Sequence, residues 1–170
     1  MTAAGKLLRR AVDVREGETA ALLWSSAYFL LILTSYYILR PIRDEMGRAG
    51  GVRNLAWLFT GTLLGMLLLH PVFTSMVARF PRRQFIPYIY RFFIANLLVF
   101  FAVFHWANEA QTVWVGRVFF IWVSVFNLFV VSVFWSFMAD LYRPQQSKRL
   151  FGMLAVGGTV GAIIGASITG

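Results

Sequence analysis

The residues best suited to chemistry lie at the end of the first apolar run, in the stretch YYILRPIRDE. On a continuing helix, Tyr36, Arg40 and either Arg43 or Asp44 lie three or four positions apart and form one stripe. Arginine binds phosphate or carboxylate through two parallel hydrogen bonds, so this stripe could hold an organic anion. Alternatively, Arg40 pairs with Asp44 one helical turn away, and both side chains reach the headgroup region of a membrane. Residue types alone leave both interpretations open.

A second group of polar residues lies in the long apolar run over 113–139. Ser124 and Trp135 return to nearly the same helix face as Arg117, and Asn127 lies to one side of it. Polar residues grouped in this way favour a partly hydrated inward face, although serine and asparagine also hydrogen-bond between membrane helices. The candidate substrate-binding residues are therefore Tyr36, Arg40, Arg43, Asp44, Arg117 and Asn127.

The composition identifies lipid as the solvent for most of the chain. Hydrophobic residues make up 59% of the 170 residues and charged residues only 14%, whereas soluble proteins carry about 25% charged residues. The formal net charge of +9 could indicate nucleic-acid binding. However, the basic residues lie in short loops between apolar runs, as membrane topology requires. We therefore expect the lipid bilayer, and not nucleic acid, to be the partner of these segments.

The sequence contains no pattern that would support catalysis or metal binding. Cysteine is absent, and the two histidines, His70 and His105, are far apart and lack metal-ligand spacing. Glycine-rich phosphate loops, nucleophile elbows and zinc-binding helix motifs are also missing from the sequence. The sequence thus predicts neither an enzyme nor a bound cofactor or metal.

The apolar segments predict an all-α polytopic membrane protein. A polar leader over residues 1–19 precedes apolar runs long enough to cross the roughly 30 Å hydrocarbon core as helices. Strands are excluded because the runs lack the alternating polarity of a membrane barrel. The predicted spans cover residues 20–39, 55–78, 86–107, 113–139 and 150–169.

The distribution of Lys and Arg predicts the orientation of these spans. The leader, the RFPRRQ turn and the connector before the last span lie on one side and hold most of the basic loop residues. Positive loops stay on the cytoplasmic side, so we expect the N-terminus in the cytoplasm. Five spans are one short of the six-helix half that many transporters use. We therefore expect these residues to be the first part of a longer protein.

Small residues mark the places where helices are expected to touch. Gly61 and Gly65 are four residues apart, and the same spacing joins Gly157, Gly161 and Gly165. Glycine at this spacing lets two membrane helices approach closely.

The stretch TSMVARFPRRQFI resembles the signature between the second and third spans of the major facilitator superfamily. It matches that signature at its arginine and at its closing basic pair, and Ala78 replaces the acid of the pattern. The resemblance implies a major-facilitator-like helical bundle and a loop that helps to close the cytoplasmic side. The candidate gating residues are Arg79, Arg82, Arg83, Asp140 and Arg143.

A closer likeness is to the ATP/ADP translocase family, a divergent relative of that superfamily. The first span of the family ends in a pattern similar to Y-x-I-L-R-x-x-K-D, and this chain has YYILRPIRD in the same register. The stretches FWSFMAD and SKRLFG are similar to the family as well. The resemblance implies that Arg43, at the family's lysine position, meets nucleotide phosphates with Arg40 nearby. Asp44 would be the charge partner of Arg43 when the site is empty.

Taken together, the resemblance implies nucleotide exchange by alternating access in a bacterial inner membrane. These residues would form the five transmembrane helices of the N-terminal half, and the missing C-terminal half would be their partner. Two alternatives remain open. One is a major facilitator transporter of another small solute. The other is a non-transporting scaffold or sensor, in which Arg40 and Arg43 pair internally with Asp44 and Glu45 and close the cavity mouth.

Overall fold

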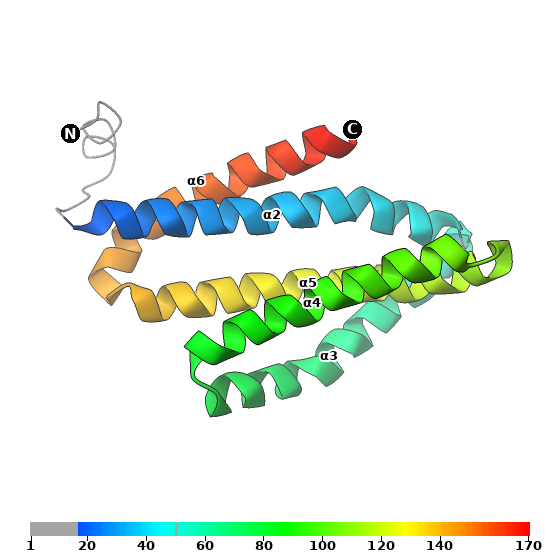
Figure 1. The fold of residues 1–170 in the computed structure, drawn as a ribbon, viewed down its shortest axis with the longest axis horizontal. Coiled ribbons are helices and arrows are strands. Elements are labelled where there is room, and N and C mark those ends of the chain that lie inside the picture. The colour runs from blue at the N-terminus through cyan, green and yellow to red at the C-terminus, as the bar shows by residue number, and fades with distance from the viewer. Residues whose placement is uncertain (1–16, 50) are drawn as a thin grey trace. The chain divides into compact units, whose positions relative to one another are not determined.

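The computed structural model describes residues 17–49 and 51–170, apart from the side chains of residues 52, 78, 82 and 83. These residues form five long helices and one short 3₁₀ turn, η1 (Val52–Asn54) (Figure 1). Within the described residues no strand is present. The helices are α2 (Glu18–Ala49), α3 (Leu55–Arg79), α4 (Arg82–Trp106), α5 (Glu109–Leu141) and α6 (Pro144–Thr169).

All five helices are long and apolar enough to cross a membrane. The helix α5 has 33 residues, which corresponds to about 50 Å at 1.5 Å per residue and exceeds the hydrocarbon thickness. The helices α3 and α4 expose large apolar side chains, such as Leu64 and Leu68 of α3 and Phe101 of α4. Faces of this kind are typical of helices that contact lipid. The prediction of an all-α fold with helices of membrane-spanning length and composition is therefore confirmed for the described residues.

The helices extend further than the apolar runs, because hydropathy detects the apolar segment and not the helix end. The first helix begins at Glu18, inside the predicted leader, and continues through Pro41 to Ala49 instead of ending near residue 39. Glutamate at a helix N-terminus interacts favourably with the helix dipole, as does Arg48 in the last turn. The rest of the leader, up to residue 16, lies outside the described residues.

Short polar motifs determine where the helices end. Gly51 has φ +91°, a backbone conformation that favours glycine, and its N–H donates to the carbonyl of Arg48 at 2.8 Å. Before α5, the N–H of Gln111 donates to Oδ1 of Asn108 at 2.9 Å, and the N–H of Asn108 donates to Oε1 of Gln111 at 3.1 Å. This reciprocal pair satisfies two backbone donors at the start of the helix.

The chain divides into two compact units, residues 1–38 with 134–170, and residues 39–133. In the first unit, the glycines of α6 lie against the backbone of α2. A Cβ atom on Gly157 would meet Ser26, one on Gly161 would meet Leu30, and one on Gly165 would meet Thr34. These glycines therefore allow the close helix approach that their spacing predicts, and the hydroxyl of Thr34 donates to the carbonyl of Gly161 at 3.0 Å.

In the second unit, α5 carries an aromatic core. The rings of Trp122 and Phe126 stack with centroids 5.4 Å apart, and Phe93 of α4 packs edge-on against Phe126 at 4.8 Å. A Cβ atom on Gly61 would meet Ile121 at 2.8 Å, so α3 also approaches α5 closely. Half of the most apolar segment of α5 is buried, against 6% for α3 and for α4. The helix α5 is therefore the central element of this unit.

The glycine contacts of α6 yield a prediction for stability. Gly161→Ala places a methyl group against the Leu30 backbone, so we expect a loss of about 1–3 kcal/mol in unfolding free energy, as for other overpacked sites. Reversible unfolding in mixed detergent micelles measures this loss. Gly152→Ala is the matched control, because nothing lies within 4 Å of the added Cβ atom, and alanine should add up to about 1 kcal/mol of helix propensity. Equal stabilities of the two variants would contradict the packing described for Gly161.

Candidate functional site

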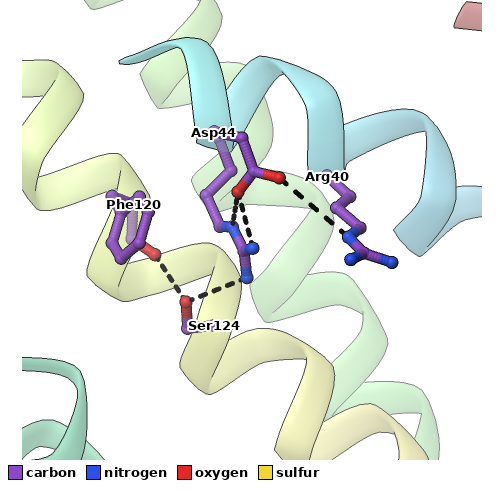
Figure 2. Close-up of polar contacts among 5 residues, drawn as sticks. Arg40, Asp44, Phe120 and Ser124 are labelled. Carbon is purple, nitrogen blue, oxygen red and sulfur yellow. Dashed lines mark hydrogen bonds and ion pairs between the residues drawn. The ribbon is translucent and has the colours of Figure 1, made fainter. Parts of the chain in front are cut away.

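An arginine–aspartate pair near the end of α2 is the core of the candidate site (Figure 2). Both Nε and Nη2 of Arg43 donate to Oδ1 of Asp44, at 2.9 and 2.6 Å. The second carboxylate oxygen, Oδ2, lies 4.0 Å from Nε of Arg40, one helical turn earlier. One carboxylate therefore lies between two guanidinium groups. The pairing of Arg40 with Asp44 considered from sequence is present, and the tighter pair is with Arg43.

The guanidinium of Arg43 also contacts α5. Its Nη1 donates to Oγ of Ser124 at 3.4 Å, and its central carbon lies 5.0 Å from the ring centroid of Phe120. The hydroxyl of Ser124 donates in turn to the backbone carbonyl of Phe120 at 2.9 Å. A cation over an aromatic face is stabilised by the ring quadrupole. The carboxylate, the hydroxyl and the ring together determine the orientation of the Arg43 side chain.

Two glycines bring this part of α2 close to α5. A Cβ atom on Gly47 would meet the Phe120 ring at 2.7 Å, and one on Gly116 would meet Cβ of Met46 at 3.2 Å. From Arg43 to Met46 along α2, the contacted residue on α5 changes from Ser124 to Gly116, so the two segments are antiparallel. The long side chain of Arg43 consequently lies along α5 and is only 16% exposed.

The three charged residues differ in exposure. Asp44 is 32% exposed and Arg40 is 48% exposed, whereas Arg43 is largely covered. In the next ion pair along the helix, Arg48 lies 3.6 Å from Glu45, and both side chains are more than 60% exposed. Exposed pairs of this kind contribute little to the stability of the fold. An anion could therefore approach the pair from the side of Arg40 and Asp44. At this point the guanidinium groups of Arg40 and Arg43 face the single carboxylate of Asp44, so the group carries a net positive charge.

The other predicted substrate residues lie in different surroundings. The guanidinium carbon of Arg117 is 4.6 Å from the Trp114 ring centroid, and Arg117 shares a helix face with Phe120 and Ser124. Asn127 lies half-buried on α5, one turn beyond Ser124. The structure therefore places Arg117 and Asn127 on the helix that Arg43 contacts, and brings together only Arg40, Arg43 and Asp44.

Tyr36 belongs to the other compact unit, where its ring packs edge-on against Tyr37 with centroids 5.4 Å apart. Tyr36 lies on the same helix as Arg40 and Arg43. The contacts that form the candidate site, however, are all made by residues of the second unit.

The predicted gating residues are divided between the two units. Arg79 is exposed at the last position of α3, in the second unit. The side chains of Arg82 and Arg83, in the first turn of α4, lie outside the described part of the chain. In the first unit, Asp140 is exposed near the end of α5, and the backbone N–H of Arg143 donates to Oε1 of Gln146 at 2.9 Å. The gating role of these residues stays a prediction.

A second polar cluster, which the sequence reasoning missed, joins the starts of α2 and α6. Oε1 of Glu18 accepts from Nε2 of Gln146 at 2.8 Å and from Nη2 of Arg149 at 3.2 Å. Glu18 is 11% and Arg149 is 24% exposed, so this ion pair is better shielded than the one at Asp44. The sequence did contain a signal for this pair. Glu18 lies just before the first predicted span and Arg149 directly precedes the fifth, and the predicted topology places both residues on the same side of the membrane.

Tyr142, between α5 and α6, is buried next to this cluster. Its hydroxyl donates to Oγ of Ser25 at 3.1 Å. Burial raises the pKa of the Tyr142 phenol, and the negative charge of Glu18 acts in the same direction, while the hydrogen bond to Ser25 acts in the opposite one.

No protein-family model, curated protein or solved structure matches the chain. The class of protein is therefore argued from the helices of the described residues and from the arginine–aspartate group. The described residues form an all-helical chain with five segments of membrane-spanning length, and an arginine–aspartate group lies near the end of the first of them.

The raised pKa of Tyr142 predicts a loss of stability in alkali. The native state holds the phenolic proton more tightly than the unfolded chain, so this contribution is complete below pH 10.0, the ordinary pKa of tyrosine, and declines as pH rises through the native pKa. Comparing unfolding in detergent at pH 8 and pH 11 measures it. Tyr142→Phe should show a smaller alkaline loss than wild type, whereas Ser25→Ala keeps the phenol and should retain the loss. An unchanged loss in Tyr142→Phe would contradict this account.

Proposed function

We propose that the chain forms most of the N-terminal bundle of a secondary transporter for organic anions, with nucleotides as the substrate class. The observation that carries this proposal is the position of Arg43. Its guanidinium is largely covered, is oriented by Asp44, Ser124 and Phe120, and shares the carboxylate of Asp44 with Arg40. Positioned guanidinium groups are the usual protein groups for binding phosphate.

The geometry supports a binding cycle in which Asp44 and substrate compete for Arg43. In the empty site, Oδ1 of Asp44 accepts both guanidinium hydrogen bonds. A phosphate presents the same type of acceptor oxygen and carries more charge, so it could replace the carboxylate on Arg43. Arg40 is closer to solvent and would meet the anion first. Ser124 and Phe120 keep the Arg43 side chain in place during the exchange.

The remaining predicted residues fit this proposal as outer contacts and gates. Arg117 supplies a further guanidinium on the helix that Arg43 contacts, and Asn127 an amide. Tyr36 lies earlier on the first helix. In a major-facilitator-like fold, two helical bundles rock about a central cavity, and differential binding of the substrate shifts the inward and outward populations. We assign the cytoplasmic gate of that cycle to Arg79, Arg82, Arg83, Asp140 and Arg143.

This proposal includes membership of a family like the ATP/ADP translocases and a location in a bacterial inner membrane. The YYILRPIRD motif supports the family assignment, because its Arg and Asp positions are those that form the ion pair on α2. The C-terminal half of the transporter would supply the second bundle and the other wall of the cavity.

One observation favours a second candidate, a non-transporting scaffold or sensor. Arg40 and Arg43 both have Asp44 as an internal partner, as expected for a closed cavity mouth. Glu45 does not take part in that arrangement as this alternative expects, because its ion pair is with Arg48. The two functions differ in flux, so a transport measurement separates them.

The first test is nucleotide exchange in proteoliposomes containing the complete protein. Replacement of Arg43 by glutamine removes a charged hydrogen bond that is worth about 1.5–3 kcal/mol. We expect Arg43→Gln to raise the half-saturation concentration for ATP by about 10-fold or more.

Arg48→Gln is the matched control for this test, because it removes an arginine from the same helix whose pair is exposed. Its transport should equal that of wild type. Unchanged ATP affinity in Arg43→Gln would remove Arg43 from the site. If wild type moves neither ATP, ADP nor other organic anions, the transporter proposal fails and the scaffold is favoured.

The proposed orientation is tested by labelling. These 170 residues contain no cysteine, so labelling above the level of wild type reports the introduced cysteine. Ala110→Cys, at the start of α5, should react with a membrane-impermeant maleimide on intact cells, because this end is expected outside. Gln145→Cys, at the start of α6, should react only after permeabilisation. The reverse pattern would place the N-terminus outside.

A further inference from the structure

His70 is an ionisable residue in the interior of a membrane-spanning helix. It lies about 22 Å along α3 from Leu55 and about 14 Å from Arg79, at 1.5 Å per residue. Ionisable groups at such depth are costly and usually functional. His105 is different, because it lies one residue from the end of α4 and its ring is 6.1 Å from that of Trp106, as expected near an interface.

The side chain of His70 lines a groove of about 710 Å³ on α3. Most of the lining is apolar and includes Leu128 of α5, and the polar members are His70, Thr74 and Ser75. The described lining contains no carboxylate, guanidinium or ammonium group. A positive charge on the imidazole would therefore be balanced by dipoles of nearby polar groups, and not by an ion pair.

Thr74 provides the first of these dipoles. Its Oγ1 lies 3.2 Å from Nδ1 of His70 and donates to the backbone carbonyl of His70 at 3.0 Å. The Thr74 hydroxyl has one hydrogen, which it donates to the carbonyl of His70. The contact with the imidazole then requires Nδ1 of His70 to carry a hydrogen and to donate it to Oγ1 of Thr74. The lone pair of Nε2 is then available. Protonation of Nε2 leaves the contact with Thr74 unchanged, so this contact suits both charge states.

Pro71 leaves a second acceptor, the backbone carbonyl of Leu67, without its helical donor. Proline has no N–H, so it gives no helical hydrogen bond to the carbonyl of Leu67, four residues earlier. Leu67 also lines the groove. Ser75 donates to the carbonyl of Val72 at 2.8 Å, and this bond does not use the lone pairs of its own oxygen. The groove is thus lined by an imidazole base and by the hydroxyl groups of Thr74 and Ser75.

We propose that His70 is a proton-binding site, and that protonation of Nε2 accompanies anion movement. The proton comes from water on one side of the membrane and is released to water on the other, with no other bond made or broken. Histidine is the side chain whose ordinary titration range lies nearest neutral pH, which suits reversible binding of this kind. The binding of the proton stands on the groove alone, and its coupling to an anion rests on the proposed function.

Proton binding is tested without any transport measurement. In the complete protein, ¹⁵N-labelled imidazole can be followed by NMR in lipid nanodiscs from pH 5 to pH 8, and the His70 signal is identified as the one that is lost in His70→Gln. We expect the Nδ1–H tautomer at pH 8 and protonation of Nε2 as the pH falls. Thr74→Val should change the tautomer ratio. An imidazole whose spectrum does not change across this range would overturn the proposal.

Coupling is tested by nucleotide uptake into proteoliposomes under an imposed pH gradient, with the complete protein and radiolabelled ATP. An acidic exterior should raise the uptake rate of wild type several-fold. His70→Gln should lose this response while ATP/ADP exchange without a gradient continues, and His105→Gln should keep it. A response in His70→Gln equal to that of wild type would overturn the coupling. Absence of all nucleotide flux in wild type would instead overturn the proposed function, with the NMR titration still deciding proton binding.

Discussion

The structure of the second unit depends on the cost of removing the Arg43 charge from water. A guanidinium that is largely covered is stable only if its hydrogen bonds and its charge are satisfied where it lies. Asp44 provides the charge and two hydrogen bonds, Ser124 provides a further acceptor, and Phe120 provides an aromatic face. The close approach at Gly47 makes this possible, because a side chain there would collide with the Phe120 ring.

This constraint gives the end of α2 its two roles. The helix continues through Pro41 to Ala49, so the charged residues are held on a regular element and not on a loop. A binding group on a rigid helix needs less ordering when a ligand arrives. At the same time the pairing with Asp44 avoids an uncompensated charge in the empty state. The same contacts thus stabilise the helix end and maintain Arg43 in a geometry suited to anions.

The sequence predicted the existence of each of the five long helices, because long apolar runs dominate them. It did not predict their ends, since α2 and α6 include polar turns that continue the helix beyond the hydrophobic segment. The ion pair on α2 was within reach of sequence reasoning, because Arg40, Arg43 and Asp44 are near neighbours on one helix. The contact of Arg43 with Ser124 was not, because it depends on which face of α5 lies opposite. The pair of Glu18 with Arg149 was missed for the same reason, although its position relative to the spans was visible.

In the contact between α2 and α6 of the first unit, glycine residues bring the two helix backbones into direct contact. Gly157, Gly161 and Gly165 have no side chains, so the facing surface of α6 is smooth where it lies on the backbone of α2. Close approach of the two backbones brings many atoms within dispersion range, which stabilises the contact. The hydrogen bond from Thr34 to the Gly161 carbonyl is a directional contact across this surface. The Phe29 ring and the Leu33 side chain lie over the neighbouring Gly158, so they fix the position of α6 along α2 together with this hydrogen bond.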